Sequence, residues 1–275
     1  MDLKHAVVVI TGAASGIGRA LAAAAARRGA RAVVATDVAE AGVVRAAAEI
    51  GKGVVGRRLD VRDADAFAAL VADVVREHGR IDLLVNNAGI GVAGEAQAGG
   101  QPDHRVFGHG VRHQERHRAQ PRRAGDVEDV PLTLLHHRRV GGADAVHHAA
   151  DVDVDDGVPV HAAEVLRLEG GPLGVGVSVL CPGPIDTPLI DTANPPGMPP
   201  VKTAPDIRKY LEGLAGKAYP VEKTAEEALD GVEDDRGVIV LPRMARLLWR
   251  ASRFTPIVVE KVVAAALAKV RRERR

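Results

Sequence analysis

The central part of this chain lacks several residue types that polar catalytic sites commonly use. Residues 95–163 contain no lysine, tyrosine, tryptophan, serine or asparagine, yet they hold nine of the eleven histidines in the 275-residue sequence. Aromatic residues make up only 2% of the whole chain. A hydrophobic core must therefore come mainly from aliphatic side chains, and the central part lacks the tyrosine, serine and lysine that often carry proton transfer.

Cysteine and long apolar runs are also scarce. The single cysteine, Cys181, excludes an intramolecular disulfide framework and suits a reducing compartment. No apolar stretch reaches the roughly 18–20 residues that span a bilayer, and the segment MDLKHAVVVITG lacks a secretory cleavage site. The net charge of +1 implies no bulk attraction to nucleic acid. We expect a cytoplasmic protein with no nucleic-acid partner.

The first 94 residues alternate short apolar runs with helix-forming segments. Runs rich in β-branched residues predict strands at 6–11, 32–36, 53–61 and 81–85. The segments between them predict helices at 18–28, 39–50 and 63–78, the last one capped by Asp63. Further on, a strand is expected at 174–180, a helix at 222–232 and a strand at 237–241. The pattern predicts an α/β fold: a doubly wound parallel sheet in three layers (α/β/α) and a single domain.

A glycine-rich turn joins the first expected strand to its helix. In Thr11–Gly18 (TGAASGIG), Gly12 permits a tight turn, Gly16 lets backbone N–H groups approach a pyrophosphate, and Gly18 lets the helix pack closely on the strand. The helix N-terminus adds a partial positive charge. The alternative is that these glycines serve turn geometry alone.

Asp37 lies at the end of the second expected strand, about twenty residues after the turn. A carboxylate there can accept hydrogen bonds from an adenosine ribose and would repel a 2′-phosphate, which favours NAD over NADP. The alternative is that Asp37 only caps the helix that follows.

Together these segments resemble the classical short-chain dehydrogenase/reductase family. The resemblance rests on TGAASGIG, on Asp60-Val61, on NNAG at 86–89 and on CPGPIDTP at 181–188. It implies a Rossmann-like NAD(P)-binding domain over residues 1–242 with NAD as cofactor and NADP less favoured. The implied cofactor-binding residues are Gly12, Ser15, Gly16, Ile17, Gly18, Asp37, Asp60, Val61, Asn87, Ala88, Gly89, Pro182, Gly183, Ile185 and Thr187.

The same resemblance assigns roles to these residues. Asp60 and Val61 would flank the adenine, Asn87–Gly89 would line the cofactor, and Ile185 and Thr187 would hold the nicotinamide carboxamide. The implied reaction is hydride transfer between a secondary alcohol and a carbonyl on a small-molecule substrate. The family also implies a homo-oligomer.

The proton-transfer residues of that family are missing where its spacing places them. The family uses a serine, a tyrosine and a lysine four residues after the tyrosine. Those positions fall near Arg138, Asp151 and Asp155. Tyr210 and Tyr219 come after the Pro-Gly motif, the CPGPIDTP segment at 181–188, and we do not expect either tyrosine to serve as the acid. The catalytic residues are therefore unknown, and the alternative function is a catalytically inactive chain that binds the dinucleotide.

The histidines could in principle replace them, as metal ligands or as acid/base groups. His113 and His117 have the i,i+4 spacing of a helical metal pair, and His136 and His147 have Asp144 nearby in sequence. Neighbouring arginines oppose a bound cation, and no hydrophobic period would position the ligands. We predict no metal site.

A shifted reading frame would explain the unusual composition of residues 95–163. Read one nucleotide later, the codons of VRHQERHRA at 111–119 permit FGTKNAIA, a helical sequence of the kind this family places at its subunit interface. As written, the span is rich in glycine, proline and charge, which predicts poor order. Leu132–Leu135 (LTLL) is the segment that could still insert as a short strand.

Residues 243–275 are basic and amphipathic, with apolar side chains such as Leu247, Trp249 and Phe254 among many arginines. They predict a C-terminal helical tail with one of two uses: a peripheral membrane contact, or a helix that packs on the domain and ends in a solvated basic segment.

Overall fold

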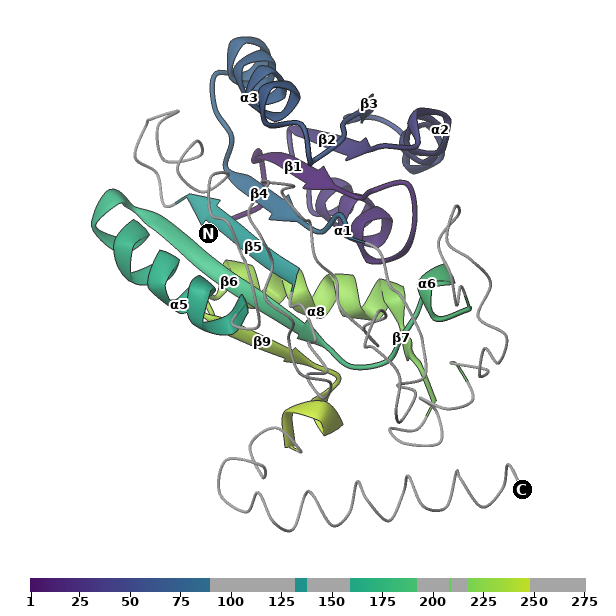
Figure 1. Cartoon of the computed structure of the whole chain (residues 1–275), viewed down its shortest axis with the longest axis vertical. Helices are drawn as coiled ribbons and strands as arrows, with labels where there is room; N and C mark the ends of the chain where they lie inside the picture. The colour runs from purple at the N-terminus through teal and green to yellow at the C-terminus, as the bar shows by residue number, and fades with distance from the viewer. Residues whose placement is uncertain (90–131, 138–158, 192–207, 209–216, 248–275) are drawn as a thin grey trace, which may run out of the picture.

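The structure, a computed structural model, describes residues 1–89, 132–137, 159–191, 208 and 217–247 (Figure 1). Strands and helices alternate through the first 89 residues, as the sequence predicts. The elements in chain order are β1 (Val7–Thr11), α1 (Gly16–Arg27), β2 (Ala32–Asp37), α2 (Glu40–Ile50), β3 (Val54–Arg58), α3 (Ala64–His78), β4 (Leu83–Asn86), β5 (Leu132–His137), α5 (Pro159–Gly170), a 3-10 turn (Gly171–Leu173), β6 (Val175–Pro182), β7 (Ile185–Asp186), α6 (Pro188–Asp191), β8 (Tyr219–Pro220), α8 (Val221–Glu233) and β9 (Val238–Leu241).

The main sheet has seven strands in the order β3-β2-β1-β4-β5-β6-β9. The strands β1, β2, β3 and β4 pair in parallel, as do β6 and β9. The predicted α/β doubly wound sheet is confirmed. A second, two-stranded sheet joins β7 to β8.

Strand β5 departs from the parallel arrangement that the sequence predicted. The segment around Leu132–Leu135 does insert as a strand, but it runs antiparallel to both β4 and β6, with Leu84 opposite Leu135 and Leu180 opposite Leu132. Antiparallel pairing satisfies the same backbone donors and acceptors as parallel pairing. A short apolar run carries no signal of direction, so the sequence could not predict this orientation.

Two hydrophobic cores lie on opposite faces of the sheet (Figure 1). Successive residues of β1 divide between them, because side chains alternate along a strand: Val8 and Ile10 belong to the core with α1, α2 and α8, while Val7 and Val9 belong to the core with α3 and α5. Every residue of β1 is buried. This is the three-layer arrangement expected from the sequence.

The helix ends follow from local chemistry. Asp63 caps α3 by accepting a 3.0 Å hydrogen bond from the Ala66 N–H, and Gly79 ends the helix in a left-handed conformation. Both ends agree with the sequence prediction. Helix α1 begins two residues earlier than expected, at Gly16, so its first turn lies inside the glycine-rich segment.

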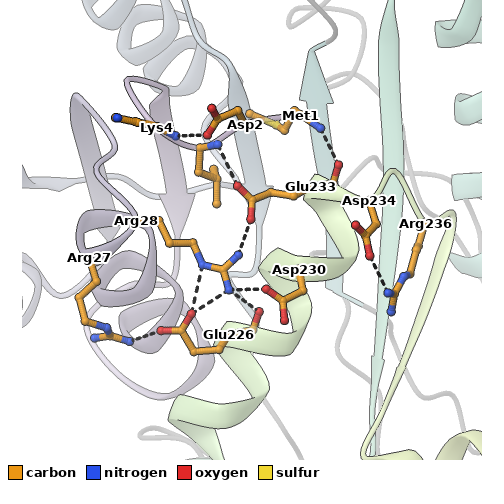
Figure 2. A network of polar contacts seen from close by, with 11 residues as sticks. Met1, Asp2, Lys4, Arg27, Arg28, Glu226, Asp230, Glu233, Asp234 and Arg236 are labelled. Carbon is orange, nitrogen blue, oxygen red and sulfur yellow. Dashed lines mark hydrogen bonds and ion pairs between the residues drawn. The ribbon is translucent and has the colours of Figure 1, made fainter.

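A cluster of charges fastens α8 to the end of α1 (Figure 2). The Arg28 guanidinium contacts Glu226 at 2.8 Å, Asp230 at 2.7 Å and Glu233 at 2.5 Å, and Arg27 contacts Glu226 at 2.7 Å. Hydrogen bonds from Arg27 and Arg28 hold the pKa of the Glu226 carboxyl below its usual range. Helix α8 is therefore fixed to the helix whose other end forms the glycine-rich turn.

Several predictions concern residues that the structure does not describe. Poor order was predicted for residues 95–163. The structure describes only 132–137, which form β5, and 159–163, which begin α5, so for the other residues the poor order stays a prediction. Residues 243–247 are helical, and Met244 and Leu247 are exposed. Residues 248–275 lie outside the described part, so the role of the tail also stays a prediction. In the described part, no helix combines the length and apolar character needed to cross a membrane.

Candidate cofactor site

The glycine-rich turn lies at the carboxyl end of β1 and requires its glycines. Gly12 and Gly16 have positive φ angles of 66° and 56°, which side chains rarely adopt. A Cβ added at Gly12 would lie 2.7 Å from the Ala88 Cα, and one at Gly18 would overlap the side-chain amide of Asn87. The turn is thus packed directly against the segment that follows β4.

Thr11 and Asn87 hold these two segments together. The Thr11 hydroxyl donates to the Val85 carbonyl at 3.3 Å and accepts from the backbone N–H groups of Asn87 at 2.9 Å and Ala88 at 3.0 Å. The Asn87 side-chain amide donates to the carbonyls of Thr11 at 2.8 Å and Gly12 at 3.1 Å. The structure therefore brings the predicted residues Gly12, Gly18, Asn87 and Ala88 together. Gly89 is the next residue and is exposed.

The N-terminus of α1 has no side-chain cap of its own, although the Asp37 carboxylate binds the Ala14 N–H two residues before it. Ser15 is extended and makes no side-chain capping bond, and the first turn contains no acidic residue. Ile17 packs against the core beneath the turn. On the outer side, a Cβ at Gly16 would lie 3.6 Å from Thr187. This cradle of backbone N–H groups between two segments fits a pyrophosphate.

Asp37 connects the turn to the end of β2. One carboxylate oxygen accepts from the Ala14 N–H at 3.1 Å, and the other accepts from the Ala39 N–H at 3.0 Å, next to the start of α2. The structure does not show the helix cap weighed as the alternative, because the N-cap of α2 is Ala39 and no side chain caps it. The bond from Asp37 to Ala39 closes a turn before the helix. It does not occupy the whole carboxylate, because each oxygen can accept a second hydrogen bond.

Asp60 and Val61 follow β3 beside Asp37, since the Leu59 N–H donates to the Asp37 carbonyl at 2.9 Å. Arg62 donates hydrogen bonds to the Asp60 carboxylate from its Nε at 2.9 Å, its Nη2 at 2.6 Å and its backbone N–H at 3.0 Å. These hydrogen bonds, helped by the charge of Arg58, lower the Asp60 pKa to about 2. Val61 packs against the core that contains α3.

The Pro-Gly segment lies at the carboxyl end of β6. Pro182 is paired with Leu241 of β9, whose carbonyl accepts the Gly183 N–H at 2.6 Å. Ile185 in β7 lies beside Tyr219 in β8, and the Tyr219 N–H donates to the Pro184 carbonyl at 2.8 Å. Thr187 reaches the phosphate turn at Gly16. The carboxyl ends of β1, β2, β4 and β6 thus carry all of the predicted cofactor residues except Asp60 and Val61, which follow β3.

Sequence reasoning missed two arginines in this region, Arg62 and Arg208. Arg208 donates to both oxygens of Asp191, at 2.7 Å and 2.8 Å, and contacts Asp186 at 2.8 Å. The spacing Asp60-Val61-Arg62 is a signal that could have been noticed. Arg208 is seventeen residues from Asp191, and no local pattern marks that pair.

A Tyr-x-x-x-Lys spacing was also missed, at Tyr219 and Lys223. The Tyr219 hydroxyl donates to Glu227 at 2.9 Å, and the Lys223 ammonium lies over the ring, 5.5 Å from its centre. Burial and the Glu227 carboxylate raise the Tyr219 pKa, more than Lys223 lowers it. A family acid requires the opposite shift. These contacts anchor β8 to α8.

The positions expected for the family's proton-transfer residues, Arg138, Asp151 and Asp155, lie outside the described residues, as do His113 and His117. Among the residues that the structure does describe, no group of three or more histidine, cysteine, aspartate or glutamate side chains could hold a metal ion.

Comparison with known proteins gives one consistent family. Residues 6–105 match the family described as short chain dehydrogenase. The chain is 37% identical over 201 residues to 1-deoxy-11-beta-hydroxypentalenate dehydrogenase of Streptomyces avermitilis, covering 69% of this chain and 72% of that one. It is 32% identical over 270 residues to the protein named "Probable oxidoreductase EphD" of Mycobacterium tuberculosis, covering 91% of this chain. The chain spans only 43% of the length of EphD.

Solved structures support the fold. A short-chain dehydrogenase/reductase of Burkholderia phymatum in complex with NAD aligns with a TM-score of 0.60 at 21% identity, covering 92% of this chain and 96% of that one. A 3-ketoacyl-(acyl-carrier-protein) reductase of Brucella melitensis complexed with NADH aligns with a TM-score of 0.55 at 21% identity, covering 87% and 97%. Because the Streptomyces dehydrogenase is 37% identical over 69% of this chain and 72% of its own length, this protein belongs to the short-chain dehydrogenase/reductase family of oxidoreductases.

Proposed function

We propose that this chain binds NAD along the carboxyl edge of its sheet and does not itself catalyse hydride transfer by the family's tyrosine–lysine chemistry. The observation that carries the binding proposal is the uncapped N-terminus of α1, which begins in a turn with two positive-φ glycines and lies close to Thr187. Such a terminus supplies backbone N–H groups and partial positive charge to a pyrophosphate.

In this proposal the cofactor extends to both sides of the phosphate turn. Its adenosine would lie between Asp37 and the Asp60-Val61 pair, and its nicotinamide would lie by Ile185 and Thr187. Asn87 would act by fixing the turn, as its bonds to Thr11 and Gly12 suggest. The bound cofactor would supply a hydride donor or acceptor, while these residues bind and orient it.

The preference for NAD over NADP is supported by Asp37. Its carboxylate is held in place by two backbone N–H groups, and it keeps acceptor capacity for a ribose hydroxyl. A 2′-phosphate placed there would bring a second negative group against a fixed carboxylate. The neighbours of Asp37 in sequence, Thr36 and Val38, offer no positive charge, and the cation across the sheet is Arg58, which pairs with Asp37.

The proposed lack of turnover is supported by what replaces the acid/base residues. The family spacing places Asp151 and Asp155 where a tyrosine and a lysine are needed. An ordinary aspartate is ionised at neutral pH and cannot donate the proton. Tyr219, which does have a lysine four residues later, has a raised pKa and a hydroxyl bonded to Glu227.

A second candidate function is the family reaction itself, the interconversion of a secondary alcohol and a carbonyl. Two observations favour it. The match to EphD extends over 270 residues, and the match to the family ends at residue 105, inside the histidine-rich span. A shifted reading frame that begins near residue 105 would explain why the family match ends there and why the family's serine, tyrosine and lysine are missing. Under this candidate, the gene read in the +1 frame encodes the missing tyrosine and lysine.

The decisive experiment measures binding and turnover on the same preparation. Titration of NADH by fluorescence and of NAD and NADP by calorimetry gives the affinities, and a panel of secondary alcohols and ketones tests turnover. Binding of NAD without turnover supports the first candidate. Turnover by the chain as written would overturn the proposed inactivity. Nucleotide sequencing across codons 95–163 tests the frame: a +1 frame with no Tyr-x-x-x-Lys motif excludes the second candidate's explanation.

A further inference from the structure

We propose that Arg208 is a positioning residue that holds the nicotinamide half of the cofactor site in place, a role that rests on the proposed binding of NAD. Arg208 joins Asp186, the residue after Ile185, to Asp191, the last residue of α6. Thr187 lies between these two aspartates in the chain. One guanidinium thus clamps both ends of the short segment that faces the phosphate turn.

The geometry of this clamp is specific. Two parallel hydrogen bonds of 2.7 Å and 2.8 Å join Arg208 to both oxygens of Asp191, and a contact of 2.8 Å joins its Nη1 to Asp186. Two-pronged arginine–carboxylate pairs fix orientation as well as distance. The Arg208 side chain is 31% exposed, so water only partly competes for it. The hydrogen bonds from Arg208 hold the Asp191 pKa below its usual range.

The same segment is fixed independently on its other side. Ile185 pairs with Tyr219 in the two-stranded sheet, and the Tyr219 hydroxyl binds Glu227 of α8. The charges of Arg28 fasten α8 to α1, whose first turn begins at Gly16. At the Asp191 end of the segment, the burial of Ile190 and the ion pairs of Arg208 act together. Loss of Arg208 should therefore loosen the segment that holds Thr187 opposite Gly16.

The positive charge of Arg208 should also affect cofactor binding. Asp186 and Asp191 are more than half exposed and stand on either side of a residue that faces the phosphate turn. A pyrophosphate bound there would feel both carboxylates, and the guanidinium offsets them. Exposed ion pairs often contribute little to stability. The expected effect is accordingly on cofactor affinity, not on folding.

The test compares Arg208→Gln with the natural chain, using NAD and 5′-AMP as separate probes. The variant should weaken NAD binding about tenfold, the scale of a lost charge-assisted clamp. Binding of 5′-AMP, which carries the adenosine and one phosphate but no nicotinamide, should weaken less than NAD binding does, by about threefold at most. A merely structural loss would weaken both ligands equally. Arg236→Gln is the matched control, because Arg236 also pairs with an exposed aspartate, Asp234, in the turn between α8 and β9 (Figure 2). It should leave both affinities unchanged.

If Arg208→Gln folds poorly, two further variants test the role of Arg208. Arg208→Lys retains the charge but cannot form the two-pronged pair, so it should show an intermediate loss of NAD affinity. Asp191→Asn should weaken NAD binding alone and add little to Arg208→Gln, since the two residues act as one unit. Unchanged NAD affinity in Arg208→Gln, or equal losses for NAD and 5′-AMP, would overturn the role of Arg208. Failure of the natural chain to bind NAD would instead overturn the proposed function and the clamp with it.

Discussion

The carboxylate of Asp37 accepts a 3.1 Å hydrogen bond from the backbone N–H of Ala14, which ties the end of β2 to the glycine-rich turn. Asp37 therefore has two roles in the proposed site: it shapes the turn, and it presents a negative charge where a ribose would bind. Replacing the carboxylate by an amide of the same size removes the charge and one of the two acceptor oxygens.

For Asp37→Asn we expect the ratio of NADP to NAD affinity to rise about tenfold, because the repulsion of a 2′-phosphate is removed. NAD affinity itself should fall a few-fold, since an amide offers one acceptor oxygen where the carboxylate used two. Calorimetric titration with both dinucleotides measures the ratio. Asp2→Asn is the control, because Asp2 also accepts a backbone N–H two residues later, at 2.8 Å from Lys4. An unchanged ratio in Asp37→Asn would show that Asp37 does not set cofactor choice.

Much of this fold could be predicted because its signals are local. The apolar runs gave β1, β2 and β4 nearly to the residue, and Asp63 and Gly79 marked the ends of α3. Capping and strand burial depend on neighbours in sequence, so a single sequence contains them. The expected third strand was too long at its end: β3 stops at Arg58, and the chain then turns toward Asp60.

What could not be predicted depends on residues far apart in sequence. The charge cluster joins Arg28 to Glu226, separated by 198 positions, and no spacing rule reveals such a pair. The direction of β5 was equally hidden, because Leu132–Leu135 is apolar in either direction. Tyr219 and Lys223 show the converse problem: their spacing matches a catalytic motif, while the Glu227 contact and burial give the tyrosine a raised pKa.

The Arg28 cluster should contribute measurably to stability. Arg28→Met leaves Glu226, Asp230 and Glu233 together without their shared cation. Because the Arg28 side chain is only 18% exposed, we expect a loss of about 2 kcal/mol in the free energy of unfolding. Urea denaturation at neutral pH measures it. The adjacent Arg27 is 56% exposed and contacts Glu226 alone, so Arg27→Met should cost less than about 0.5 kcal/mol. Equal effects of the two variants would contradict the argument.

Gly12 should tolerate no side chain. In Gly12→Ala the new Cβ would lie 2.7 Å from the Ala88 Cα and 2.9 Å from the Asn87 amide, at a φ of 66°. We expect a loss of at least about 2 kcal/mol in stability and loss of NAD binding. Gly171→Ala is the control, because nothing lies within 4 Å of its built Cβ and its φ is not positive. Thermal unfolding with and without NAD tests both. A Gly12→Ala chain that binds NAD normally would refute the proposed role of the turn.

The pair formed by Asp60 and Arg62 predicts a specific dependence on pH. The Asp60 pKa is lowered to about 2 in the folded chain, below the ~3.9 of an unfolded aspartate. A carboxyl whose pKa is lowered by folding stabilises the folded chain at pH values above its unfolded pKa. That stabilisation is lost as the pH falls from about 4 to about 2. Asp60 is 25% exposed and its partner 68% exposed, so solvent screening should keep the contribution below about 1 kcal/mol.

Arg62→Ala should therefore return the Asp60 pKa toward about 3.9. The Asp60 pKa is measured by following its carboxyl-carbon NMR shift from about pH 1.5 to about pH 6, the range in which aspartates titrate. Urea midpoints for the natural chain and the variant should differ at neutral pH and converge only below about pH 2, where Asp60 is protonated in both. Arg76→Ala removes a similar exposed pair, with Asp73, and should leave the Asp60 titration unchanged. If Asp60 titrates near its unfolded value in the natural chain, the grip of Arg62 seen here is too weak in solution to orient Asp60 for an adenine.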